Sequence, residues 1–258
     1  MIGKPTDGPI SRYINRKLSM PISRLIIRYN KDVSPNLITI LTTILGILSG
    51  ITYLFAPAWF AGMMVQIASI LDGVDGEIAR ATNKQSPFGG FLDSLLDRLV
   101  DISIIICISL SILLDSLVYI QLTILFAFSM LALSGSILVS FMNARSEASL
   151  GKHPSKIGGI TIATRDIRLF IIFTGSLITV ITKEALIWTL GVLAFLTYLH
   201  VFLNLGIISS RYLAREIGES IHIAKTVEHN DVCRGNSSRS PEEISEGNGQ
   251  AKSQSIHL

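Results

Sequence analysis

Four aspartates interrupt an otherwise apolar part of the chain, in the stretch LDGVDGEIARATNKQSPFGGFLDSLLDRLVD that begins at Leu71. Asp72 and Asp75 are three residues apart and Asp93 and Asp97 four, so on helices each pair shares a face. The short connection NKQSPFGG predicts that the two helices are antiparallel neighbours, which would bring all four carboxylates together. Clustered carboxylates without cations would be partly protonated, whereas Mg²⁺, Mn²⁺ or Ca²⁺ suits their oxygens. The spacing therefore predicts a divalent metal site.

A glycine and an arginine follow the first aspartate at helical spacing. Asp72, Gly76 and Arg80 lie at i, i+4 and i+8, so they line one side of a helix. Because Gly76 has no side chain, Arg80 can reach a phosphate that the metal also holds. Together these residues predict a phosphate or pyrophosphate site, where two metal ions can stabilise the attacking and leaving oxygens of phosphoryl transfer.

Two other interpretations of the aspartates explain less. Buried ion pairs with Arg80 and Arg98 would leave four acids against two bases. An ion transporter would need acids that step across the bilayer, whereas these acids gather toward one membrane face. A transporter would also tolerate Asp97→Asn, whereas an enzyme should lose turnover and keep its fold.

The composition is that of an integral membrane protein. Only 16% of the 258 residues are charged, against about 25% in soluble domains, and the mean hydropathy is +0.52. The net charge of +3 is small, so we expect no nucleic-acid partner. Two cysteines do not indicate a disulfide framework.

Apolar runs predict an all-α integral membrane protein with six transmembrane helices. They lie at about 36–56, 58–82, 89–114, 117–143, 166–182 and 185–209. Within the first run, Gly46 and Gly50 favour close packing against another helix. Lys and Arg concentrate in alternate connections, and the other connections hold only Lys183. The positive-inside rule therefore predicts a multi-pass protein of the cell membrane, with both termini and the aspartates on the cytoplasmic side.

Three regions follow from this pattern. Residues 1–34 mix apolar and basic residues, which is typical of an amphipathic helix on the membrane surface. Residues 35–215 would form the six-helix domain. Residues 216–258 are rich in Ser, Glu, Gly, Asn and Lys, and we expect this polar tail to be disordered.

The aspartate-rich stretch also resembles a known family. The pattern Asp72-x2-Asp75-Gly76-x2-Ala79-Arg80-x8-Gly89-x3-Asp93-x3-Asp97 has every fixed position of the signature of the CDP-alcohol phosphotransferases. The likeness covers about residues 9–215. Members of that family transfer a phosphate-linked group from a CDP-activated donor to an alcohol and release CMP.

This resemblance implies roles for the site residues. Asp72, Asp75 and Asp93 would hold two divalent ions, Mg²⁺ or Mn²⁺. Asp97 would complete one metal site and act as the base that takes the acceptor's proton, since a nearby cation keeps a carboxylate charged. The CDP moiety would contact Pro35, Asn36, Gly76, Arg80 and Ser86. The family resemblance also implies a homodimer.

Arginines near the fifth span are candidates for binding the phosphate of the acceptor: Arg145, Arg165 and Arg168. The positive-inside rule alone would also explain basic residues here. Asn143 stands where some lipid-making relatives that use inositol phosphate carry a lysine. This departure weakens assignment to that branch.

Two further stretches, KPTDGPISRYINRKLS and ATRDIRLFIIF, resemble the di-myo-inositol phosphate phosphate synthases. The resemblance implies that CDP-inositol and inositol 1-phosphate are joined into the precursor of a compatible solute. Many such relatives are fused to a cytidylyltransferase. This chain begins just ahead of the basic segment, so we expect a separate cytidylyltransferase to supply the donor.

Phospholipid synthesis and intramembrane prenyl transfer are the two alternative enzyme activities. In phospholipid synthesis, a phosphatidyl group would pass from CDP-diacylglycerol to inositol phosphate or glycerol phosphate. Intramembrane prenyltransferases also pair aspartates with Mg²⁺, but they lack the Asp-Gly-x2-Ala-Arg core.

Overall fold

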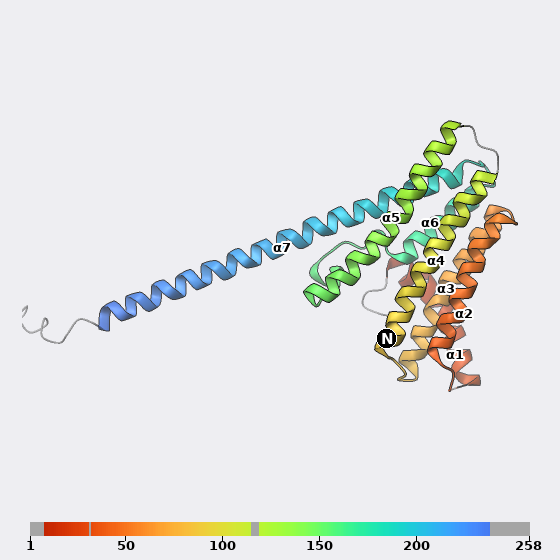
Figure 1. Cartoon of the computed structure of the whole chain (residues 1–258). Coiled ribbons are helices and arrows are strands. Elements are labelled where there is room, and N and C mark those ends of the chain that lie inside the picture. Colours follow the sequence, from red (N-terminus) through yellow and green to blue (C-terminus); the bar gives the residue numbers. More distant parts are fainter. Residues whose placement is uncertain (1–7, 31, 115–118, 238–258) are drawn as a thin grey trace, which may run out of the picture. The chain divides into compact units, whose positions relative to one another are not determined.

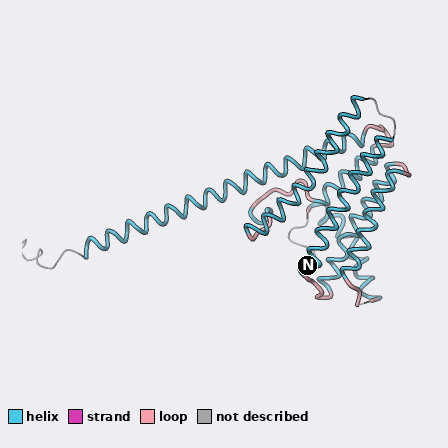
Figure 2. The backbone as a smooth tube through the Cα atoms, viewed as in Figure 1, coloured by secondary structure: helices cyan, strands magenta, loops and turns pink. Residues whose placement is uncertain are grey.

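The computed structural model describes residues 8–30, 32–114 and 119–237, and within these ranges it contains helices and loops but no strand (Figure 2). The helices are α1 (Arg16–Tyr29), α2 (Pro35–Ile51), α3 (Ala58–Ala81), α4 (Pro87–Leu114), α5 (Tyr119–Leu150), α6 (Arg165–Ile178) and α7 (Ala185–Ser237). Short turns of helix are η1 (Ser11–Asn15), η2 (Thr52–Leu54) and η3 (Pro154–Ile157). The predicted all-α class is confirmed.

Among the described residues, three segments are long and apolar enough to cross a membrane: Pro35–Leu54, Leu122–Leu150 and Ala185–Ala214. The other three predicted spans also form helices, α3, α4 and α6. Charged residues reduce the apolar character of α3 and α4. At 14 residues, α6 is about 21 Å long, shorter than a bilayer core of about 30 Å. The count of six spans therefore stays a prediction.

Helix α2 packs against both α3 and α4, and the three helices run alongside one another (Figure 1). The two glycines of α2 make this contact close, as predicted. A Cβ atom on Gly46 would lie 2.8 Å from Val100, and one on Gly50 would lie 3.2 Å from the Cα atom of Ile104. The apolar core includes Ile104, Ile108 and Leu190. The core thus fixes α3 and α4. The aspartates lie near the end of α3 and the start of α4.

Helix α1 packs on α3, but with its polar side. Asn15, Arg16, Ser19 and Ser23 are buried. The apolar side chains on the other side are exposed, and they include Tyr13, Leu18, Leu25 and Tyr29. The polar side of α1 therefore faces the protein interior, and its apolar side is exposed. The placement of the exposed apolar face on a membrane surface stays a prediction.

Two boundaries differ from the sequence prediction. Helix α5 continues to Leu150, which puts Arg145 on a helix and not in a loop. Helix α7 continues to Ser237, so residues 216–237 are helical where we expected disorder. Ala, Arg, Glu and Lys in this part favour helix, and α7 contains no proline. Residues 208–258 form a unit separate from residues 1–207, and the rest of the predicted tail, 238–258, lies outside the described residues.

Candidate functional site

The end of α3 and the start of α4 bring three aspartates together. Asp72, Asp93 and Asp97 each offer a carboxylate oxygen, and these oxygens lie within 4.8 Å of one another. A short connection, residues 82–86, joins the two helices and makes this meeting possible. The predicted convergence of carboxylates is confirmed for these three residues. Oxygens this close fit a divalent cation, which binds carboxylates at about 2.0–2.6 Å.

Asp75 is oriented by the neighbouring helix α2. Its Oδ2 atom accepts a hydrogen bond of 2.5 Å from the hydroxyl of Thr39, and its Oδ1 atom accepts one of 2.5 Å from the backbone N–H of Gly76. The side chain is buried. Asp75 does not belong to the group of three converging carboxylates, so its role as a metal ligand stays a prediction.

Two cavities meet at the aspartates. The larger has a volume of about 680 Å³ and the smaller of about 200 Å³. Asp75, Gly76 and Asp93 line both. Asp72 and Asp97 line the larger cavity. Ligands in the two cavities would therefore meet at the same carboxylates.

The smaller cavity is lined by all five residues predicted to contact the nucleotide, namely Pro35, Asn36, Gly76, Arg80 and Ser86. They come from the starts of α2 and α4 and from the end of α3. Two of these side chains, Arg80 and Asn36, lie so close to a glycine that a larger residue there would crowd them. A Cβ atom on Gly76 would lie 3.2 Å from Nη1 of Arg80, and one on Gly89 would lie 3.1 Å from Oδ1 of Asn36. As predicted, the missing side chain at Gly76 makes room for the Arg80 guanidinium.

Arg165, at the start of α6, enters the carboxylate cluster. Its guanidinium lies 2.5 Å from Asp72, 2.9 Å from Asp97 and 3.2 Å from Asp101. The sequence-based interpretation took only Arg80 and Arg98 as possible ion-pair partners of the aspartates. This was wrong, because Arg165 also pairs with them. Three carboxylates this close stabilise the charged form of the guanidinium. The guanidinium is therefore a permanent cation among the aspartates.

Asp101 anchors the arginines from the other side. It is buried, and its carboxylate lies 2.6 Å from Arg168 and 3.6 Å from Arg98. These ion pairs with arginines of α4 and α6 give Asp101 a structural role. Arg168 also donates a hydrogen bond of 3.0 Å to the carbonyl of Ala163, which fixes the loop before α6.

The larger cavity has a polar wall made by α5, α6 and the loop between them. Arg165 and Arg168 line it, whereas Arg145 is exposed and is not among its lining residues. Asn143 and Thr164 also line it, and each has a buried side-chain oxygen without a hydrogen-bond partner among the described residues. Such atoms offer hydrogen bonds to a polar ligand. Two of the three predicted acceptor arginines thus lie where a ligand could reach them.

Three residues that make buried or part-buried contacts were not predicted from the sequence. Glu77 on α3 is fully buried and bound by α1. Asp166 accepts a hydrogen bond of 2.7 Å from the backbone N–H of Ser11. Thr39 orients Asp75. Of the three, only the burial of Glu77 could have been predicted from the sequence. Ser69, Gly73 and Glu77 are spaced by four residues and form a second stripe of polar or small residues beside the aspartates on α3.

Comparison with known proteins gives consistent results. The sequence profile described as CDP-alcohol phosphatidyltransferase matches residues 32–203. A bifunctional IPC transferase and DIPP synthase of Archaeoglobus fulgidus is 37% identical over 187 residues, which cover 70% of this chain and 35% of that protein. A protein of the same name from Thermococcus kodakarensis is 39% identical over 54% of this chain and 30% of its own length. This chain thus spans about a third of the length of these relatives.

Shorter relatives and solved structures agree. The archaetidylinositol phosphate synthase of Pyrococcus horikoshii is 33% identical over 72% of this chain and 91% of its own length. The fold is similar to crystal structures of the phosphatidylinositol phosphate synthase of Mycobacterium tuberculosis, at 23% identity with CDP-DAG bound and 24% in complex with manganese and citrate. Both have a TM-score of 0.62 and cover 74% of this chain, with 94% and 88% of the respective crystallised chains.

Proposed function

Because the chain belongs to the CDP-alcohol phosphatidyltransferase family, we propose that it transfers a phosphate-linked alcohol from a CDP-activated donor to the hydroxyl of a second alcohol and releases CMP. One observation carries this proposal: Asp75, Gly76 and Asp93 form a common wall of the two cavities. A donor held in the smaller cavity would present its pyrophosphate to the larger one, where the acceptor would lie.

The residues divide the chemistry between them. Pro35, Asn36, Gly76, Arg80 and Ser86 bind the CDP moiety in the smaller cavity. Asp97 takes the proton of the acceptor hydroxyl as that hydroxyl attacks phosphorus. Asp72, Asp75, Asp93 and Asp97 would hold two Mg²⁺ or Mn²⁺ ions, which would stabilise the charge on the attacking and leaving oxygens. Arg165 and Arg168 bind the acceptor phosphate, with Arg145 a more distant candidate.

The first choice of substrates is CDP-inositol and inositol 1-phosphate, which would give di-myo-inositol phosphate phosphate (DIPP), a precursor in compatible-solute synthesis. Two relatives named DIPP synthase, at 37% and 39% identity, support this choice. The polar wall of the larger cavity supports it as well, since Asn143 and Thr164 offer hydrogen bonds to a polyol.

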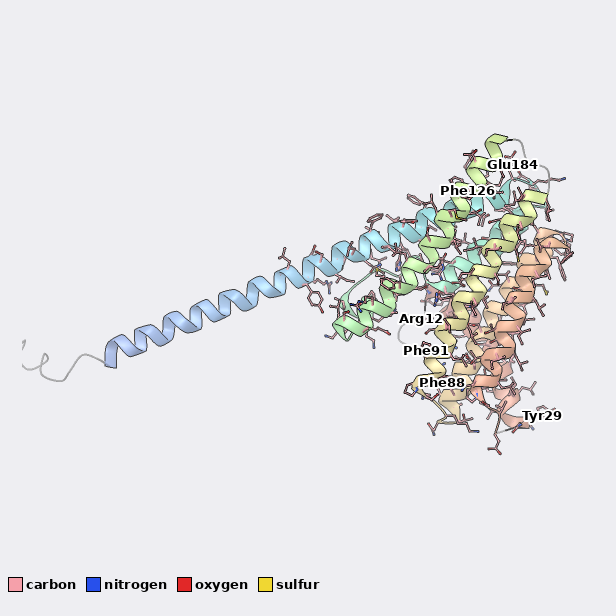
Figure 3. All side chains as sticks on the ribbon, viewed as in Figure 1. Arg12, Tyr29, Phe88, Phe91, Phe126 and Glu184 are labelled. Carbon is pink, nitrogen blue, oxygen red and sulfur yellow. The ribbon has the colours of Figure 1, made fainter. Side chains whose placement is uncertain are left out.

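Phospholipid synthesis is the second candidate, and a different observation favours it. Part of the larger cavity's lining is apolar and reaches the surface, with Phe91 62%, Leu95 49% and Phe141 62% exposed. Phe91 lies near Phe88 at the start of α4 (Figure 3). This apolar opening between α4 and α5 would admit the acyl chains of CDP-diacylglycerol. The relative named archaetidylinositol phosphate synthase adds support.

The membrane arrangement completes the proposal. We place six helices, α2 to α7, across the cell membrane, with both termini and the aspartates on the cytoplasmic side as the positive-inside rule predicts. Residues 1–34 would lie at the membrane surface, 35–215 would form the catalytic domain, and 216–258 would be an appendage without chemistry. The protein would act as a homodimer, and a separate cytidylyltransferase would make CDP-inositol.

A donor comparison tests the proposal. The purified protein is incubated with Mg²⁺ and inositol 1-phosphate together with either CDP-inositol or CDP-diacylglycerol, and CMP release is followed. CMP from CDP-inositol alone supports DIPP synthesis. CMP from CDP-diacylglycerol alone moves the protein to phospholipid synthesis. CMP from neither donor, also with a panel of other alcohols, would refute transfer from CDP-activated donors.

A further inference from the structure

A buried carboxylate on α3 lies outside both cavities. Glu77 is 1% exposed, and it is not among the residues that line either cavity. It accepts hydrogen bonds from three residues of α1. Its Oε1 atom accepts hydrogen bonds from Arg16 at 2.8 Å and from Ser19 at 2.6 Å, and its Oε2 atom accepts one from Ser23 at 2.5 Å. Glu77 therefore joins two helices and does not meet a substrate.

Arg16 connects this carboxylate to the backbone of the aspartate turn. The Nη1 atom that binds Glu77 also donates a hydrogen bond of 3.0 Å to the carbonyl of Gly73, the residue after Asp72. A Cβ atom on Gly73 would lie 2.8 Å from that nitrogen. Glycine at position 73, which is not a fixed position of the family signature, is thus explained by the approach of Arg16.

The contact continues at Asn15, the last residue of η1, directly before α1. Asn15 donates a hydrogen bond of 3.2 Å to the hydroxyl of Ser69 and accepts one of 3.1 Å from Gln66. On α3, positions 66, 69, 73 and 77 are spaced by three, four and four residues, so they form one stripe of the helix. The aspartate side, with Asp72, forms the adjacent stripe. Contact of the stripe at positions 66–77 with α1 therefore fixes the rotation of α3 about its axis. This rotation in turn sets the direction in which the Asp72 side chain points.

A buried ion pair is a costly way to join two helices. Apolar residues of similar volume often stabilise a protein equally well or better, and the best-attested use of buried polar pairs is to specify one register. Here the register decides where the Asp72 carboxylate points. Glu77 lies five residues after Asp72, about one and a half turns along the same helix, so a small rotation or shift of α3 at this ion pair would also move Asp72.

We propose that Glu77, acting through Arg16, Ser19 and Ser23 of α1, is a positioning residue that holds Asp72 in the geometry needed for metal binding. The inference rests on the metal site of the proposed function. Helix α1, which we propose lies at the membrane surface, would then also set the metal affinity of the site.

The test measures metal binding without turnover. Mn²⁺ binding to the purified protein in detergent is followed by the loss of the free Mn²⁺ signal in electron paramagnetic resonance. Glu77→Gln and Arg16→Met should each weaken Mn²⁺ binding about tenfold, the lower end of the effect seen for residues that orient metal ligands. Arg16→Lys, which keeps the charge, should recover part of the affinity.

Matched control variants make the same substitutions, Arg to Met and Glu to Gln, at exposed positions. Arg24 is exposed on the same helix α1, so Arg24→Met should leave Mn²⁺ binding unchanged. Glu184 is exposed at the opposite end of the helices from Phe88 (Figure 3), and Glu184→Gln should do the same. If Glu77→Gln does not fold, Ser23→Ala and Gly73→Ala replace it, and both should weaken Mn²⁺ binding in folded protein.

The outcomes separate positioning from simple stabilisation. A lowered melting temperature with unchanged Mn²⁺ affinity in Glu77→Gln, Ser23→Ala and Gly73→Ala would overturn the inference. Wild-type protein that binds no Mn²⁺ would overturn it too. Wild-type protein that binds Mn²⁺ but releases no CMP from any donor would refute the proposed function, while weaker Mn²⁺ binding by the variants would still support the positioning role.

Discussion

The guanidinium of Arg165 lies 2.5 Å from the carboxylate of Asp72, among the oxygens that would hold a divalent cation. The same nitrogen lies 2.9 Å from Asp97. Arginine and metal would therefore share ligands. The arginine neutralises the carboxylates before metal and substrate arrive, and its positive charge repels the incoming cation. An acceptor phosphate that binds the guanidinium would relieve this competition.

Replacing Arg165 should have opposite effects on metal and acceptor. In Arg165→Met, Asp72 and Asp97 lose a competing cation, so Mn²⁺ should bind about tenfold more tightly, a change of about 1.4 kcal/mol. The KM for the phosphorylated acceptor should rise, because a bidentate donor to phosphate is lost. Mn²⁺ titration and steady-state CMP release measure the two effects. Weaker Mn²⁺ binding would contradict this account of Arg165.

Asp97→Asn should stop turnover without unfolding the protein. The amide cannot take the proton of the acceptor hydroxyl, and the loss of a general base costs about 100-fold or more in rate. CMP release measures the effect, and a thermal melt checks the fold. Glu184→Gln is the control for an acid-to-amide change, since Glu184 is exposed and lies at the opposite end of the helices from Phe88 (Figure 3). Retained activity in Asp97→Asn would exclude it as the base.

Much of the fold follows from local sequence features. The apolar runs predicted helices α2 to α7 at nearly their observed positions because each run extends over many residues. The length of α7 was missed because a polar composition was interpreted as disorder, although Ala, Arg, Glu and Lys favour helix. The number of spans does not follow from apolar length alone, because the functional residues of α3 and α4 reduce their apolar character.

The metal cluster could be predicted because all its members lie on two consecutive helices joined by a short turn. Arg165 could not be placed there, since it lies 68 positions after Asp97 and only the packing of α6 on α3 brings it in. The contact of Arg16 with Glu77 was missed for the same reason. The polar stripes of α1 and α3 are both visible in the sequence. No feature of either segment, however, indicates that the polar side of α1 faces the protein interior.

Asp101 should stabilise the site more than it serves the chemistry. In Asp101→Asn the buried guanidinium of Arg168 loses its partner at 2.6 Å. Leaving such a charge uncompensated costs about 3 kcal/mol or more, so the melting temperature should fall clearly. Adding Arg168→Met should recover part of the lost stability, because that buried charge is then removed. A melting temperature that Asp101→Asn does not change would contradict the anchoring role.

Gly76→Ala should weaken binding of the CDP donor. The added Cβ atom would lie 3.2 Å from Nη1 of Arg80 and would push the guanidinium away from the smaller cavity. Such crowding costs about 1–3 kcal/mol, which corresponds to roughly 5- to 150-fold in the KM for the donor. The KM for the acceptor should stay within about twofold, since Gly76 meets the larger cavity only at the wall that the two cavities share.

The matched control for this variant is Gly206→Ala. It makes the same chemical change inside a helix, and its Cβ atom would meet nothing within 4 Å. Gly206→Ala should therefore leave both KM values unchanged and raise helix stability slightly. If Gly76→Ala raised the KM for the acceptor and not that for the donor, the nucleotide could not lie beside Arg80, and the assignment of the two cavities would have to be reversed.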